Sequence, residues 1–392
     1  MKPFHLKMPS EIIFGEGKIE ELPEAISKFG NQALIITGEH SLFKSGNADR
    51  IFDMLNNRQI KVTHQKISGE PTVELIDYLC DLYADGNADV IVGIGGGSVL
   101  DTAKAISVML TEEGSVSEYI ESIGNRTLSG KNIPLICVPT TAGTGSEATN
   151  NAVIAEYSPR TFKRSLRNDA MIPDIAIIDP ELTLHSTFPV TANSGIDTFC
   201  QLLEAYTSTK SNAFTDAITL QGFRLISQNL VPVCTSSAED IKVRSKVSYA
   251  ALLSGIGIMN SSVTVIHGFA SAIGGRYPIP HGAICGAMLL GCTLTNMRKA
   301  QKYALNDDTT VRFAKLGSIL SGIEYDYDKH DVLLRAVTEE IKTIGSKIKL
   351  QSLSQLGVRK DDFYNIVSDT RLNGNPIPLT ETDLMEILEM CY

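Results

Sequence analysis

The sequence predicts two domains, an α/β domain with a parallel sheet over residues 1–188 and an all-helical domain over residues 189–392. Three observations support this fold class. Short runs rich in β-branched residues alternate with helical segments in the first half. After Pro189 these runs fade, and long amphipathic or apolar helical patterns replace them. A chain of 392 residues with 43% hydrophobic side chains can also fill two cores.

Five runs in the first domain are predicted as strands, and four longer patterns in the second as helices. Continuous apolar strands separated by helices are typical of a parallel sheet that helices cover on both faces. One run alternates in polarity instead, which indicates a strand with one exposed face. The strands are residues 33–37, 60–64 (the alternating run), 90–94, 135–138 and 175–178, and the helices are 197–206, 242–258, 263–273 and 332–344.

Composition limits the classes of partner. A formal net charge of −10 disfavours binding to nucleic acid or to an anionic membrane through a general basic surface, although Lys163, Arg164 and Arg167 remain a candidate local patch. No run has the length and apolarity of a membrane span, and the first residues lack the apolar core of a signal peptide. The seven cysteines include no C-x-x-C pair. We therefore expect a cytoplasmic protein without a disulfide framework.

A glycine cluster carries the first chemical signal. Gly95, Gly96, Gly97 and Ser98 follow the strand at 90–94, and residues 99–109 read as a helix with Asp101 in its first turn. This context lets backbone N–H groups approach a phosphate at the positive end of a helix dipole. The string is not a complete G-x-G-x-x-G, so a tight strand-to-helix turn remains the alternative.

A second loop strengthens the nucleotide interpretation. It also follows a strand, so it lies at the same carboxyl edge of the predicted sheet, where open α/β sheets bind nucleotides. It supplies hydroxyl groups and flexible backbone in the segment Thr140-Thr141-Ala142-Gly143-Thr144-Gly145-Ser146-Glu147.

Two histidines and an aspartate form a candidate metal site. His267 and His281 are fourteen positions apart, and Asp197 lies about seventy positions upstream at the start of a helical pattern. Imidazole and carboxylate are ligands that Zn²⁺ and Fe²⁺ accept. A histidine on an apolar helix is more often a core or cap residue, so the pair alone leaves both readings open.

Four motifs, in this order, resemble the iron-containing (group III) alcohol dehydrogenases over nearly the whole chain. They are GGGSVLDTAK at 95–104, PTTAGTGSE at 139–147, DPEL at 179–182 and IPHG at 279–282. The resemblance implies a Rossmann-like NAD(P)-binding domain and a helical domain, with metal and substrate in the cleft between them. It also implies a homodimer or larger homo-oligomer.

The resemblance assigns roles to the loop residues. Gly95, Gly96, Gly97 and Ser98 would hold the pyrophosphate, with Asp101 in the same helical turn. Thr140, Thr141 and Thr144 would line the cofactor cleft, and Lys163 would lie near the nicotinamide ribose. Members that prefer NAD often carry aspartate at the end of the first long strand. Here Gly38 and then Glu39 stand there, which favours tolerance of NADP.

The metal site departs from the family pattern at two positions. Asp197, His267 and His281 match ligands, but Gln201 stands where the family has a histidine ligand, and Ser271 where it has a histidine near the reacting centre. Three outcomes stay open. Gln201 completes the site, the other three ligands leave a position open for water or substrate, or the chain no longer binds metal tightly.

The sequence thus predicts a metal-dependent oxidoreductase that interconverts a primary alcohol and its aldehyde with NAD(P), using Fe²⁺ or Zn²⁺. Predicted catalytic residues are Lys163, His267 and Ser271, and the substrate is expected to be polyhydroxylated or anionic. One alternative is an octulosonate-type sugar-acid oxidase or dehydrogenase that uses a redox metal and oxygen, with Arg164, Arg167 and Arg276 as carboxylate partners. Another is a catalytically silent nicotinamide-binding protein.

Overall fold

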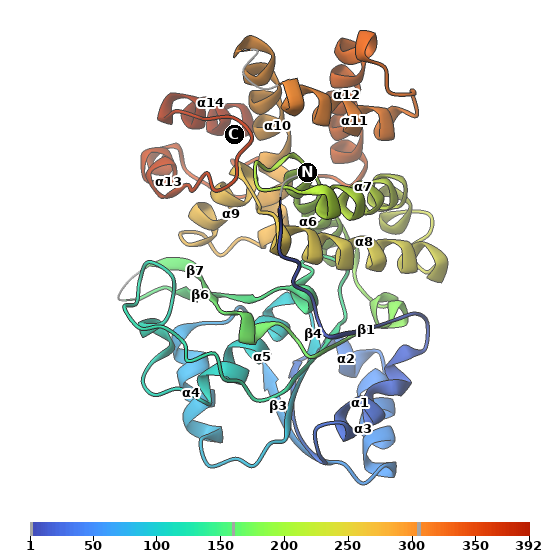
Figure 1. Ribbon diagram of the computed structural model, residues 1–392, viewed down its shortest axis with the longest axis vertical. Helices are drawn as coiled ribbons and strands as arrows, with labels where there is room; N and C mark the ends of the chain where they lie inside the picture. The colour runs from blue at the N-terminus through green and yellow to red at the C-terminus, as the bar shows by residue number, and fades with distance from the viewer. Residues whose placement is uncertain (1–2, 159–160, 304–306) are drawn as a thin grey trace. The chain divides into compact units, whose positions relative to one another are not determined.

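In a computed structural model, which describes residues 3–158, 161–303 and 307–392, the chain forms two compact units (Figure 1). The sheet unit comprises Lys7–Thr187 and Glu239–Gly255, and the helical unit comprises Met1–Leu6, Phe188–Ala238 and Ile256–Tyr392. A domain boundary at residue 188 stays a prediction.

The sheet unit contains a six-stranded sheet in which every neighbouring pair is parallel. The five predicted strands are all present, which confirms the fold class together with the helical second half. The sequence did not predict the short edge strand β1 or the antiparallel pair β6–β7. The strands are β1 (Glu11–Phe14), β2 (Gln32–Gly38), β3 (Lys61–Ile67), β4 (Val90–Gly95), β5 (Leu135–Pro139), β6 (Asn151–Glu156), β7 (Phe162–Arg167) and β8 (Ile175–Ile178).

The sheet is covered by helices on both faces, which explains its continuous apolar strands. Successive side chains of a strand point to opposite faces. Accordingly, Ile35 packs in a core with helices α1 (Leu22–Ser27) and α3 (Asn47–Asn57), while Ile36 packs in another core with α4 (Val73–Tyr83) and α5 (Gly97–Met109). The short helix α2 (Ser41–Lys44) also belongs to the sheet unit.

The strand order β1-β8-β5-β4-β2-β3 places a topological switch between β2 and β4. The chain runs outward from β2 to β3 and then returns to the other side of β2 as β4. In open α/β sheets, ligands bind outside the carboxyl ends of strands at such a point. Gly38 ends β2 and Gly95 ends β4, so the first glycine cluster lies at the switch.

The helical unit is built around α6, which is buried along most of its length. Its Phe199 packs against Phe223 of α7, with ring centroids 4.8 Å apart. Among the described residues, no single helix combines the length and apolarity of a membrane span; α8 and α9 reach them only as a bent pair. The α-helices after residue 187 are α6 (Phe188–Thr207), α7 (Ala213–Cys234), α8 (Ile241–Asn260), α9 (Val265–Gly274), α10 (His281–Tyr303), α11 (Asp307–Ser321), α12 (His330–Lys347), α13 (Phe363–Asp369) and α14 (Glu381–Cys391). Most of α8 belongs to the sheet unit, and the others belong to the helical unit.

Candidate metal centre and nucleotide loops

Three polar residues lie on the buried helix α6. Asp197, Gln201 and Glu204 are 2%, 3% and 1% exposed. Their spacing of four and three residues puts them on one face of the helix. Because buried charges are costly unless they are paired or bind a cation, this face must meet compensating groups.

Glu204 meets three donors at the start of α9. Its carboxylate accepts from the Thr264 hydroxyl at 2.5 Å, the Ile266 backbone N–H at 2.7 Å and His267 Nδ1 at 2.5 Å. It therefore caps the first turn of α9, where Thr264 makes no side-chain cap. It also fixes the hydrogen of His267 on Nδ1, which leaves the Nε2 lone pair directed away from Glu204.

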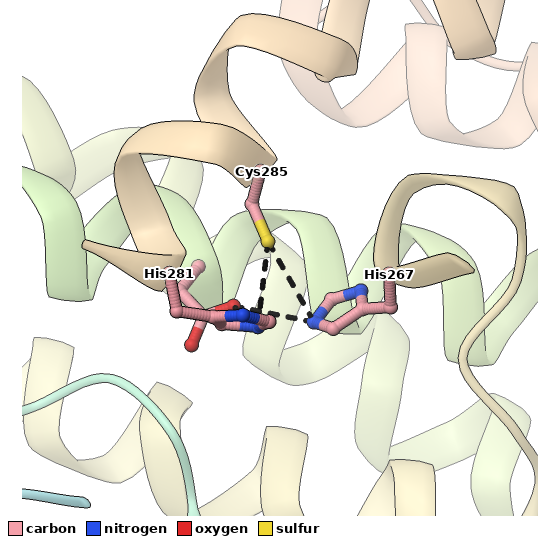
Figure 2. A group of neighbouring side chains, drawn as sticks. His267, His281 and Cys285 are labelled. Carbon is pink, nitrogen blue, oxygen red and sulfur yellow. Dashed lines mark hydrogen bonds and ion pairs between the residues drawn. The ribbon is translucent and has the colours of Figure 1, made fainter. Parts of the chain in front are cut away.

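The Nε2 atom of His267 faces a cluster of further ligand atoms. It lies 3.2 Å from Asp197 Oδ1, and His281 Nε2 lies 3.7 Å from the same oxygen. Figure 2 shows the sulfur of Cys285 directed toward both imidazole rings, at 3.6 Å from His281 Nε2 and 4.0 Å from His267 Nε2. These four ligand atoms all lie within 4.8 Å of one another. The structure thus brings three of the predicted ligands together and adds a fourth residue.

The cluster demands a positive charge at its centre. A carboxylate oxygen and the His267 Nε2 lone pair are both acceptors, so they repel unless a proton or a cation lies between them. The pKa values reflect this demand. Burial opposes protonation of His267, but Cys285, Glu204 and Asp197 outweigh it and hold its pKa well above the ordinary value. Burial also opposes ionisation of Asp197, yet His281 and His267 outweigh it and lower its pKa. The donor set therefore fits a divalent cation.

Glycine after His281 is required by close packing. His281 is the first residue of α10, and a Cβ on Gly282 would lie 2.0 Å from the backbone oxygen of Asn193 in α6. Only glycine lets the start of α10 approach α6 so closely. This approach carries His281 to Asp197 and explains the Pro-His-Gly sequence.

The two positions that depart from the family pattern have defined places. The side-chain amide of Gln201 donates to Asp197 Oδ2 at 3.1 Å, so the amide orients this carboxylate. Ser271 lies one turn after His267 on α9 and is half-buried. A ligand role for Gln201 and a catalytic role for Ser271 stay predictions.

Sequence reasoning missed Glu204 and Cys285. A signal existed for each, because Glu204 follows Asp197 by two helical turns and Cys285 follows His281 by one. Burial raises the pKa of the Cys285 thiol to about 12.

The two glycine loops of the sheet unit pack against each other. The Thr140 N–H donates to the Gly95 carbonyl at 2.9 Å. A Cβ on Gly97 would lie 2.6 Å from Thr144 Cγ2, and one on Gly96 would lie 3.5 Å from the Thr141 side chain. The helix α5 begins here, and Gly96 provides no side-chain cap. The N–H groups of Val99 and Leu100 donate to the Gly96 carbonyl, so those of Gly97 and Ser98 are the candidates for a phosphate.

Asp101 connects helix α5 to the second loop and to β6. Its carboxylate accepts from the Ser146 hydroxyl at 2.5 Å and from the Val153 N–H at 2.9 Å, and it lies 3.3 Å from the ammonium of buried Lys104. It therefore positions the second loop and β6. A direct contact of Asp101 with the cofactor stays a prediction.

Charged residues predicted near the cofactor or substrate have acidic neighbours. Lys163 forms an ion pair with Glu70 at 2.6 Å. Glu39 is half-exposed at the end of β2, next to Gly38. Two of the three candidate arginines pair with carboxylates, which weakens the case for a basic patch and for a sugar-acid substrate. These pairs are Arg167–Glu121 at 2.8 Å and Arg276–Asp369 at 2.6 Å.

Comparison with known proteins decides the family. Residues 9–180 match the family "Iron-containing alcohol dehydrogenase", and residues 191–392 match "Fe-containing alcohol dehydrogenase family, C-terminal". The chain belongs to the iron-containing alcohol dehydrogenase family. This alcohol dehydrogenase is accordingly an oxidoreductase that acts on CH–OH groups and interconverts alcohols and aldehydes.

Three relatives illustrate the match of this alcohol dehydrogenase. It is 29% identical to long-chain-alcohol dehydrogenase 1 of Geobacillus thermodenitrificans over 384 residues, which cover 96% of this chain and 94% of that protein. It is 26% identical to the NAD-dependent methanol dehydrogenase of Bacillus methanolicus, covering 97% and 98%. The crystal structure of a 1,3-propanediol oxidoreductase superposes with a TM-score of 0.90 at 25% identity, covering all of both chains.

Proposed function

We propose that this chain is a metal-dependent alcohol dehydrogenase that interconverts a primary alcohol and its aldehyde with hydride transfer to or from NAD(P). Asp197, His267 and His281 hold Fe²⁺ or Zn²⁺. The proposal rests on one main observation. Asp197 Oδ1 and His267 Nε2 lie 3.2 Å apart, and Glu204 holds the other ring nitrogen, Nδ1, of the same histidine. A histidine that binds a metal commonly donates its other ring N–H to a carboxylate in this way.

The residues around the site have separate tasks. When bound, the cation supplies a Lewis acid for the substrate oxygen, and the nicotinamide carries the hydride. Asp197 supplies the negative charge, and Gln201 holds its second oxygen. Ser271, one turn along α9 from His267, connects the substrate proton to solvent through water. Gln201 and Ser271, in place of two imidazoles, make the wall smaller and richer in hydrogen-bonding groups, which suits a polyhydroxylated or anionic substrate.

The dinucleotide site is proposed at the switch point between β2 and β4. The turn at Gly96 and Gly97 and the start of α5 hold the pyrophosphate. The relative named an NAD-dependent methanol dehydrogenase supports a nicotinamide cofactor. Gly38 leaves space for a 2′-phosphate while Glu39 is the neighbouring acid, so we propose that NADP is tolerated beside NAD. A role for Lys163 at the nicotinamide ribose and assembly as a homo-oligomer remain parts of this proposal.

The first test is metal content followed by removal and return of the metal. Anaerobically purified protein is analysed for metal, stripped with a chelator, and assayed with NAD and NADP on a panel of alcohols and aldehydes before and after Fe²⁺ or Zn²⁺ is returned. We expect loss of turnover on stripping and recovery on reconstitution.

A matched pair of variants separates the site from general damage. His267→Gln removes a proposed ligand, whereas His330→Gln changes a histidine at the start of α12 that contacts Tyr325 and is not among the four clustered residues. Metal binding and turnover are expected to fall only in the first variant. Full turnover by metal-free protein would overturn the proposal.

A further inference from the structure

We propose that the sulfur of Cys285 is the fourth protein ligand of the metal centre, which makes it an Asp-His-His-Cys site for a thiophilic divalent cation such as Zn²⁺. The inference rests on the proposed function, because it names an additional ligand of the same cation. It replaces Gln201 as the residue that completes the site.

Cys285 is placed by its helix. It follows His281 by four residues on α10, so the two side chains lie on one face, one turn apart (Figure 2). The side chain is fully buried, yet its sulfur lies among polar atoms. The sulfur is 3.6 Å and 4.0 Å from the Nε2 atoms of His281 and His267. A cysteine that served only apolar packing would face carbon atoms instead.

The spacing of the four atoms fits one tetrahedral cation. Metal bonds of ~2.0 Å to N or O and ~2.3 Å to S imply N–O edges of about 3.3 Å and N–S edges of about 3.6 Å. The N–O separations are 3.2 Å and 3.7 Å, and the N–S separations are 3.6 Å and 4.0 Å. These four edges are thus within about half an ångström of the tetrahedral values, and the N–N and S–O separations lie within 4.8 Å.

Gln201 is directed elsewhere. Its amide nitrogen donates to Asp197 Oδ2 at 3.1 Å, on the carboxylate oxygen that does not face His267 and His281. This hydrogen bond holds the amide against Oδ2 of Asp197, whereas the sulfur of Cys285 faces the two imidazoles. The ligand lost from α6 at position 201 is thus supplied from α10 at position 285, while Gln201 supports Asp197.

Thiolate coordination changes the charge and the metal preference of the site. On binding, the S–H bond of Cys285 breaks, its proton goes to solvent, and the sulfur bonds the cation. One carboxylate and one thiolate then neutralise a divalent cation in a buried position, whereas a carboxylate with three imidazoles leaves a net charge of +1. Thiolate ligands select Zn²⁺, and Zn²⁺ also exceeds Fe²⁺ in the general order of affinities.

Cobalt substitution detects a sulfur ligand without an activity assay. The full-length protein is stripped and loaded with Co²⁺, and the near-ultraviolet band of thiolate-to-cobalt charge transfer is recorded. We expect the band in the native protein and its loss in Cys285→Ser. The control is Cys292→Ser, a buried cysteine of the same helix two turns further on, which should keep the band.

Zinc binding gives a second readout. Cys285→Ser is expected to weaken Zn²⁺ binding by more than the roughly 10- to 100-fold that loss of an outer-shell partner costs, and to lower the ratio of zinc to iron in the purified protein. X-ray absorption of the native zinc protein should show one sulfur scatterer per zinc, which keeps the test valid if the variant fails to fold.

The outcomes separate the inference from the proposed function. Stoichiometric Co²⁺ or Zn²⁺ with only N and O scatterers and no charge-transfer band overturns the sulfur ligand and leaves the metal-dependent function standing. Protein that takes up no metal at all overturns both.

Discussion

Replacing Glu204 by glutamine tests whether this residue sets the metal affinity through His267. The carboxylate accepts at both ends, from Thr264 and Ile266 on one oxygen and from His267 on the other. An amide accepts only at one end. If its oxygen keeps the two donors at the start of α9, its NH₂ faces His267 Nδ1 and forces the hydrogen onto Nε2. The lone pair that binds the cation is then lost.

The expected effect is large on metal binding and modest on folding. Loss of such a partner weakens metal affinity by roughly 10- to 100-fold, or about 1.4–2.7 kcal/mol. A mismatched buried hydrogen bond also lowers the free energy of unfolding by about 1–3 kcal/mol. Affinity is measured by competition with a chromophoric chelator, and stability by thermal unfolding of the stripped protein.

The matched control for Glu204→Gln is Asp179→Asn in the sheet unit. Asp179 is 1% exposed and accepts from the N–H groups of Gly17, Ile19 and Glu181. Its amide suffers a comparable mismatch in the unit that holds none of the proposed ligands, so stability should fall without a change in metal affinity. Metal affinity within about twofold of native in Glu204→Gln, well below the tenfold expected, would refute the reasoning.

Three further predictions concern the cofactor loop, the proton path and pH. In Gly97→Ala the new methyl would lie 2.6 Å from a threonine side chain, and displacing that side chain costs about 1–1.5 kcal/mol. The Kd for the dinucleotide, measured by fluorescence titration, should therefore rise roughly tenfold. An unchanged Kd contradicts this prediction. In Ser271→Ala turnover should fall by less than about tenfold, because a serine does not take up a proton near neutral pH; a larger loss would assign Ser271 a direct role. Burial raises the pKa of Glu147 from 4.5 to about 7, against a backbone hydrogen bond and Lys104. The folded state thus binds the extra proton, stability falls as pH rises through that window, and Glu147→Gln should flatten this part of the thermal-unfolding profile, whereas an unchanged slope would exclude Glu147 as its source.

The sheet was predictable because its strands are buried on both faces and therefore read as continuous apolar runs. β1 was missed because it has only four residues, all half-buried, and a run that short carries little periodicity. The strands β6 and β7 were missed because Lys163, Arg164 and Arg167 make the second one look like a polar loop. Its charges are accommodated by partners such as Glu70 and Glu121, which no local pattern reveals.

The metal site was predictable only where residue type and motif coincide. Asp197, His267 and His281 have side chains that bind metals in many proteins, so they could be proposed from the sequence. Cys285 lies in an apolar stretch of α10 and has no cysteine nearby in the pattern of a zinc motif. Its role depends on which face of α10 meets α6, and that is decided by the close packing of Gly282 on Asn193.

The one-turn separation of His281 and Cys285 also bears on how the protein acquires its metal. Asp197 and His267 are 70 positions apart and meet only in the folded unit, but a His-x₃-Cys pair closes a very short loop even in an unfolded chain. A cation that binds this pair before folding stabilises the unfolded state as well, so the net stabilisation by metal is smaller than the full binding energy. We therefore expect the metal in freshly made protein to reflect what was available as residues 281–285 left the ribosome, as well as the equilibrium preference of the finished site.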